Sequence, residues 1–213
     1  SVARLHWDLS KDPGHKPKSN TGAMIDFSKW LQEKPSLDEK FIKEHTLALK
    51  YENNIRMLFN RFGLIGSELG RFLCDETFKP IAFAQKPDGI VFLVTQVYSN
   101  KIYNILSTTS KTRASKIISS MILPSMKAFR EAFKNTKIKY YGMLVAYGSK
   151  DFSKAEYEVL DLQAEVVSLI VSAQNCKKFV EGVLTDDEFV AASEIYSVDR
   201  DMRNLKRIKI TLE

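Results

Sequence analysis

The sequence predicts a single α+β domain in which several helices pack on a mixed or mostly antiparallel sheet. The spacing of apolar residues changes from helical to strand-like and back along the chain. The predicted elements follow the order helix, meander of short strands, helix, strand, helices, strand. No internal repeat divides the 213 residues, and a hydrophobic content of 44% is enough for one sizeable core.

The first 22 residues are expected to form an arm outside this domain. Residues 1–9 alternate between polar and apolar side chains, as a short strand does. Residues 10–22 hold two prolines, two glycines and no apolar residue, which is typical of a flexible linker. The globular domain is therefore predicted to comprise residues 23–213.

The first half of the domain is predicted to contain a long helical region and a meander. A capping box at residues 36–39 opens the helical region, which Gly63 and Gly66 are expected to bend or split. Residues 80–85 and 90–98 flank a Lys-Pro-Asp-Gly turn signal and predict a β-hairpin. Residues 99–101 are expected to turn the chain into a third strand over residues 102–106.

The second half is predicted to alternate between helices and strands. A helix over residues 113–134 is expected to be kinked or locally strained at Pro124, and the apolar run at 138–147 favours a central strand. Capping boxes at residues 153–156 and 185–188 predict one helix that ends before Gly182 and another that reaches about Tyr196. Residues 205–212 are predicted to close the chain as a strand.

The sequence lacks the motifs of common metal, nucleotide and nucleophile sites. His6, His15 and His45 have no partners at metal-binding spacing, and no phosphate-binding glycine loop or nucleophile elbow occurs. Cys74 and Cys176 each lie among apolar residues and are interpreted as free buried thiols. Together with the absence of a signal sequence and of an apolar run of ~20 residues, this favours an intracellular, cytoplasmic protein.

A metal-dependent nuclease core is the one enzyme pattern with partial support. It would use an acid on a helix, Glu68, an aspartate at the start of a strand, Asp88, and a downstream acid-x-lysine. The last feature is missing, so Asp88 is interpreted as a turn residue. No metal, cofactor or catalytic residue is predicted, and the sequence favours a protein that is not an enzyme. An enzyme with a site assembled from dispersed residues is the remaining alternative.

Positive charge is concentrated in one segment. The formal net charge is +6, and residues 111–139 hold eight basic residues against one acid, Glu131. Residues 154–194 hold nine acids against three lysines. This segregation predicts an oriented electrostatic field that matters for the choice of partner.

Five basic residues of the predicted helix share one face of an α-helical wheel, opposite its apolar stripe. They are Arg113, Lys116, Lys127, Arg130 and Lys134. The ridge would span ~32 Å, comparable with about one turn of duplex nucleic acid. Because like charges at this spacing repel, the clustering favours contact with an anion. A solvated helix face is the alternative interpretation.

The residues just before the ridge and those of the last strand are expected to extend this surface. Ser110, Lys111 and Thr112 approach a helix N-terminus, where hydroxyls, cations and backbone N–H groups would suit a phosphate or sulfate. Ordinary N-capping by Ser110 or Thr112 is the alternative. Arg207 and Lys209 lie on the polar side of the last strand.

These observations predict a non-enzymatic protein that binds a polyanion, first of all nucleic acid, through sequence-independent phosphate contacts. The alternative is an interaction or assembly module. In that case residues 2–9 would add a strand to a neighbour's sheet and form a homo-oligomer, while the basic face would meet an acidic protein surface.

Overall fold

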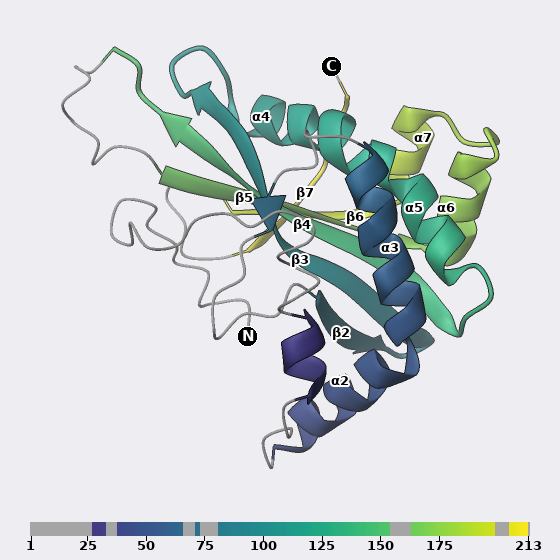
Figure 1. Cartoon of the computed structure of the whole chain (residues 1–213). Helices are drawn as coiled ribbons and strands as arrows, with labels where there is room; N and C mark the ends of the chain where they lie inside the picture. Colours follow the sequence, from purple (N-terminus) through teal and green to yellow (C-terminus); the bar gives the residue numbers. More distant parts are fainter. Residues whose placement is uncertain are drawn as a thin grey trace.

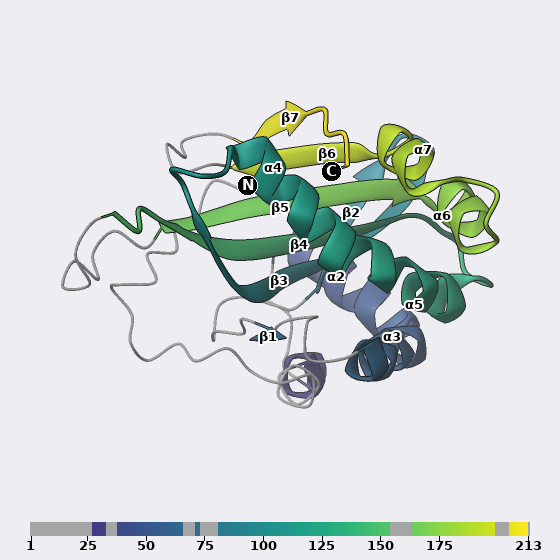
Figure 2. The same cartoon turned by 90° about the horizontal axis from the view of Figure 1, so that it is seen from above.

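The computed structural model describes residues 27–32, 38–65, 71–72, 81–153, 163–198 and 205–212. These residues form one seven-stranded mixed sheet with helices packed against it (Figures 1 and 2). The strand order is β1-β3-β4-β5-β6-β7, and β2 also pairs with β3. The predicted α+β fold is confirmed. The predicted arm, residues 1–22, lies outside the described residues.

The first helical region is divided at a different place from the one predicted. Helix α2 (Glu39–Lys50) and helix α3 (Glu52–Ile65) meet at Tyr51, and α3 continues through Gly63. The N-cap of α2 is Asp38, whose carboxylate accepts a hydrogen bond from the backbone N–H of Lys40 at 2.8 Å. The predicted cap residue at position 36 and Gly66 lie outside the described residues.

The predicted hairpin is confirmed, but the meander is not. Strand β2 (Ile81–Lys86) pairs antiparallel with β3 (Gly89–Asn104) across the expected turn. No turn occurs at residues 99–101. Instead β3 runs on for 16 residues, and an irregularity in its pairing with β4 absorbs this stretch. The third strand predicted at 102–106 is therefore the end of β3. The two-residue strand β1 (Arg71–Phe72) pairs with β3 as well.

Strand β4 (Ile138–Lys150) lies inside the sheet, parallel to β3 and antiparallel to β5 (Gln163–Ser172), so the predicted central strand is confirmed. The helix predicted to begin at residues 153–156 is wrong over residues 163–172. Those residues form β5, whose β-branched and apolar side chains suit a strand buried between two neighbours. Helix α6 (Ala173–Val180) follows it and ends before Gly182, which has a φ of +74°.

The C-terminal elements agree with the sequence in position but not in length. The capping box of helix α7 (Asp186–Ala191) is present as predicted. The helix does not reach Tyr196, because strand β6 (Glu194–Val198) follows instead. Strand β7 (Lys206–Ile208) closes the sheet against β6 and is shorter than predicted. None of the described helices is long and apolar enough to cross a membrane.

The main core fills the space between the helices and one face of the sheet. Alternate residues of β3 and β4, among them Phe92 and Tyr141, point into it and meet Phe129 and Phe133 from helix α5 (Leu123–Phe133). The ring centroids of Phe92 and Phe133 lie 4.6 Å apart. This aromatic contact fixes α5 on the sheet.

On the opposite face of the sheet, side chains from β2, β4 and β6 meet at one end. The Lys86 ammonium lies 2.5 Å from the Glu194 carboxylate and 4.4 Å from the centroid of the Tyr140 ring. Three strands separate β2 from β6 in the sheet order, so a flat sheet would put these residues ~19 Å apart. A register shift in the pairing of β3 with β4 lies between Ile90 and Val91, next to the hairpin that carries Lys86.

Candidate polyanion interface

The predicted basic helix is one helical rod that contains a π-helical turn. It consists of α4 (Ser110–Ile117), the π-turn η3 (Ile118–Ile122) and α5, and it crosses the sheet diagonally (Figure 2). In the π-turn the backbone N–H of Leu123 bonds to the carbonyl of Ile118, five residues back. Pro124, which has no N–H to donate, follows at once. The strain predicted at Pro124 thus takes the form of a wider turn before it.

The π-turn invalidates a single helical wheel for the whole rod. It holds one residue more than an α-turn, so α5 is rotated by ~100° relative to its position on a continuous α-helix. With this correction Arg113 lies ~150° from Lys127 and Lys134 instead of next to them. The predicted five-membered ridge is therefore wrong: Arg113 leaves it, and Lys116 lies ~80–100° around the rod from Lys127 and Lys134.

Three lysines of the rod remain on its solvent side. Lys116, Lys127 and Lys134 are exposed, whereas Arg130 is half-buried. We call these three lysines the basic face. None of them has an ion-pair partner among the residues that the structure describes. The one acid on this rod, Glu131, is bound to Arg61 of α3 at 3.1 Å.

The basic face is held against the rest of the domain from both ends of the rod. At the far end the side-chain amide of Asn54 in α3 donates to the carbonyl of Ala132 at 2.7 Å. At the near end Arg113 binds Glu165 of β5, with Nε to Oε2 at 3.0 Å and Nη2 to Oε1 at 2.6 Å. These contacts make the lysines part of a rigid surface.

The Arg113–Glu165 pair is almost completely buried, with side-chain exposures of 6% and 0%. Arg113 also donates through Nη1 to the carbonyl of Thr108. Its guanidinium is thus committed to protein groups and cannot contact an anion in solvent. Burial, and then the nearby Glu165 carboxylate, raise the pKa of Tyr147 well above its usual range. Tyr147 and Glu165 face each other across β4 and β5.

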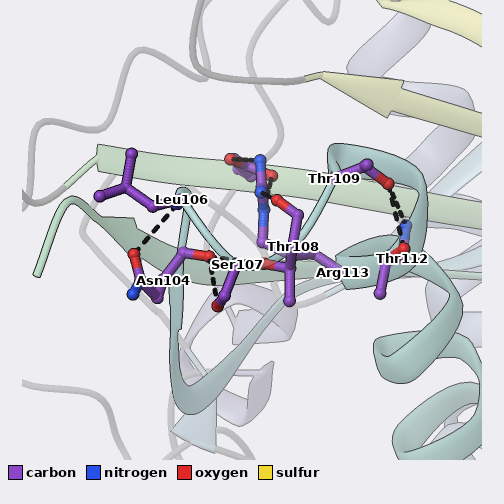
Figure 3. Close-up of polar contacts among 8 residues, drawn as sticks. Asn104, Leu106, Ser107, Thr108, Thr109, Thr112 and Arg113 are labelled. Carbon is purple, nitrogen blue, oxygen red and sulfur yellow. Dashed lines mark hydrogen bonds and ion pairs between the residues drawn. The ribbon is translucent and has the colours of Figure 1, made fainter.

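The N-terminus of α4 is capped by a residue that the sequence analysis did not choose. Thr109 is the N-cap, and its hydroxyl accepts from the backbone N–H of Thr112 at 3.1 Å (Figure 3). Ser110 and Thr112 lie inside the first turn and are half-buried, while Lys111 is exposed. Ordinary capping by Thr109 accounts for the hydroxyl-rich sequence, so of these residues only Lys111 adds charge beside the basic face.

The loop before α4 is tightly hydrogen-bonded, and sequence analysis missed it. The side chain of Asn104 accepts from the backbone N–H of Leu106 at 3.0 Å, and its carbonyl accepts from the hydroxyl of Thr108 at 2.7 Å (Figure 3). The backbone N–H of Ile105 donates to the carbonyl of Lys150 at 3.1 Å. An asparagine that bonds to the backbone two residues on is a known turn signal, and it was available in the sequence.

Arg207 and Lys209 do not extend the basic face. Ile208 and Ile210 pack against the core beneath the helices, so the residues that alternate with them point to the other face of the sheet. In keeping with this placement, Arg207 lies near Glu194 and helps Lys86 to hold the pKa of that carboxyl below its usual value. Arg207 and Lys209 therefore belong to a surface separate from the basic face, and the prediction that they extend it is wrong.

Within the described part of the chain no three histidine, cysteine or acidic side chains are close enough to hold a metal ion. His45 is nearly buried beside the ring of Trp30. Asp88 accepts a hydrogen bond from the hydroxyl of Tyr140 at 2.5 Å in the hairpin turn, whereas Glu68 lies outside the described residues. Cys176 is a buried free thiol, and burial raises its pKa to about 12. Cys74 lies outside the described residues.

The sequence matches no model of a known protein family, and no curated protein is significantly similar to it.

Proposed function

We propose that this chain binds a polyanion through its basic face, and that the polyanion is a nucleic acid contacted at its phosphates. The observation that supports the proposal is the set of three exposed lysines, Lys116, Lys127 and Lys134, on a rigid helical rod, none of which is ion-paired to a carboxylate in the described residues. A chain of phosphates along the rod would supply a counter-charge to all three lysines at once.

The spacing of the lysines suits an extended ligand better than a small anion. From Lys116 to Lys134 the rod advances ~27 Å at 1.5 Å per residue. A single phosphate or sulfate could meet only one of the lysines, whereas about one turn of a duplex could meet all three. Arg113 has no part in this contact, because it is bound to Glu165.

The proposal predicts a defined salt dependence. Three phosphate contacts contribute a slope of about −2.7 to the plot of log affinity against log salt concentration. Replacing Lys116, Lys127 and Lys134 together by Gln should therefore flatten the slope by about that amount. Fluorescence anisotropy with a labelled DNA duplex at several salt concentrations measures it.

A control with the same change in net charge replaces Lys29, Lys40 and Lys50 by Gln. These exposed lysines lie on the helices at residues 27–32 and on α2, away from the rod. The control variant should keep the slope of the parent protein. An unchanged slope in the basic-face variant, or no binding of duplex by the parent protein, would overturn the proposal.

A further inference from the structure

Three large apolar side chains are exposed at neighbouring strand ends, next to the start of the rod. Leu106 is 64% exposed, Phe152 53% and Ile102 44%. We call them the apolar tip. Ile102 and Asn104 of β3 pair with Gly148 and Lys150 of β4, so the segments that carry the three residues are adjacent.

The loop that carries Leu106 is held by hydrogen bonds, so the exposed leucine is fixed in position. The backbone N–H of Leu106 donates to the side chain of Asn104, and that of Ile105 donates to the carbonyl of Lys150. Thr108 is bound to Asn104 and to the guanidinium of Arg113. Figure 3 shows Leu106 at the end of the loop away from Thr112, with its side chain directed away from the hydrogen-bonded groups. A fixed, exposed leucine is pre-organised for contact with an apolar partner.

The position of the apolar tip beside the basic face indicates which kind of partner could contact both surfaces. The chain leads from Leu106 through the exposed Lys111 to Lys116 within ten residues, so the tip lies at one end of the basic face. A ligand that meets both surfaces must be anionic outside and apolar inside. A nucleic-acid duplex has this character, because its phosphates enclose stacked bases. Lys116, Lys127 and Lys134 extend for ~27 Å along the rod that leads away from the tip, and this length suits an elongated ligand such as a duplex.

We infer that Leu106 is a wedge that inserts between base pairs of a duplex bound along the basic face, and that Ile102 and Phe152 cover the opened step. This inference rests on the proposed function and makes it more specific. Leucine, isoleucine and phenylalanine are the side chains that open base steps in proteins that bend DNA. The lysines supply affinity from the phosphates, and the wedge favours sequences in which a step opens easily, such as TA.

A fluorescent base analogue tests the inference directly. The probe is a DNA duplex of about two helical turns with 2-aminopurine at a central TA step. The parent protein should raise the 2-aminopurine fluorescence, since unstacking relieves quenching. Leu106→Asn should abolish the rise and weaken binding about tenfold, because the burial of one leucine side chain is lost. Asn104→Ala keeps the leucine but loosens its loop, and should reduce the rise without abolishing it.

Val183→Asn is the matched control, because Val183 is also 64% exposed and lies between α6 and α7. It should change neither fluorescence nor affinity. If the parent protein binds the duplex with the predicted salt slope but leaves the fluorescence unchanged, the wedge is refuted and the proposed function stands. If it does not bind the duplex, both fail. Binding to phosphatidylserine vesicles that depends on Leu106, without a fluorescence change on the duplex, would also overturn the wedge.

Discussion

Breaking the buried Arg113–Glu165 pair should destabilise the domain more than any surface charge change. The guanidinium makes two bonds to the carboxylate, and both side chains are excluded from solvent. Glu165→Gln leaves the buried guanidinium without a compensating charge, and removal of one partner of such a pair costs about 3–5 kcal/mol. For a chain of this size that corresponds to a fall in Tm of about 10 °C, measurable by circular dichroism or calorimetry.

The pair Arg61–Glu131 supplies the matched control, because it also links an arginine and a glutamate but is half-exposed at 49% and 34%. Glu131→Gln should cost less than about 1 kcal/mol. Arg113→Met combined with Glu165→Leu removes both charges together and should recover most of the stability lost in either single variant. If Glu165→Gln melts at the temperature of the parent protein, the buried pair does not hold α4 on β5 and this reasoning is wrong.

Three further outcomes are expected. Because burial raises the pKa of Cys176 from 9.0 to about 12, the native protein should resist alkylation at this thiol near neutral pH, as measured by peptide mass spectrometry. The contribution of the protonated thiol to the free energy of unfolding should be lost as pH rises above 9. Gly142→Ala should cost about 1–3 kcal/mol in urea unfolding, since the new Cβ would lie 2.2 Å from Cδ2 of Leu93; an unchanged midpoint would contradict the packing. Lys86 holds the pKa of Glu194 below its usual value of 4.5, so the difference in free energy of unfolding between the parent protein and Lys86→Met should shrink as pH falls below 4.5. A difference that does not depend on pH would argue against the Lys86–Glu194 ion pair.

Local sequence signals predicted the structure correctly where a few adjacent residues determine the backbone conformation. The turn at residues 86–89, the capping box before α7 and the end of α6 at Gly182 each depend on a few adjacent residues, and each is found where predicted. The alternation of residues 208–212 likewise gave the correct buried side. In these places the backbone preference and the tertiary structure agree.

The errors arose where a local signal competed with tertiary structure. The capping pattern at 153–156 predicts a helix, but the β-branched run of residues 166–171 is the stronger signal for a buried strand and agrees with the structure. The π-turn could not be seen on a wheel that assumes constant periodicity, and it displaced Arg113 from the expected ridge. The partner of Arg113 lies 52 residues away, so no local pattern could have found it.

The bridge between Lys86 and Glu194 also bears on how the chain acquires its structure. The two residues are 108 positions apart, and strands β3, β4 and β5 lie between β2 and β6 in the sheet. During synthesis the hairpin emerges early and can pair locally, but Glu194 is added only in the last tenth of the chain. A nascent chain that stops before β6 therefore lacks the carboxylate that Lys86 binds in the native sheet.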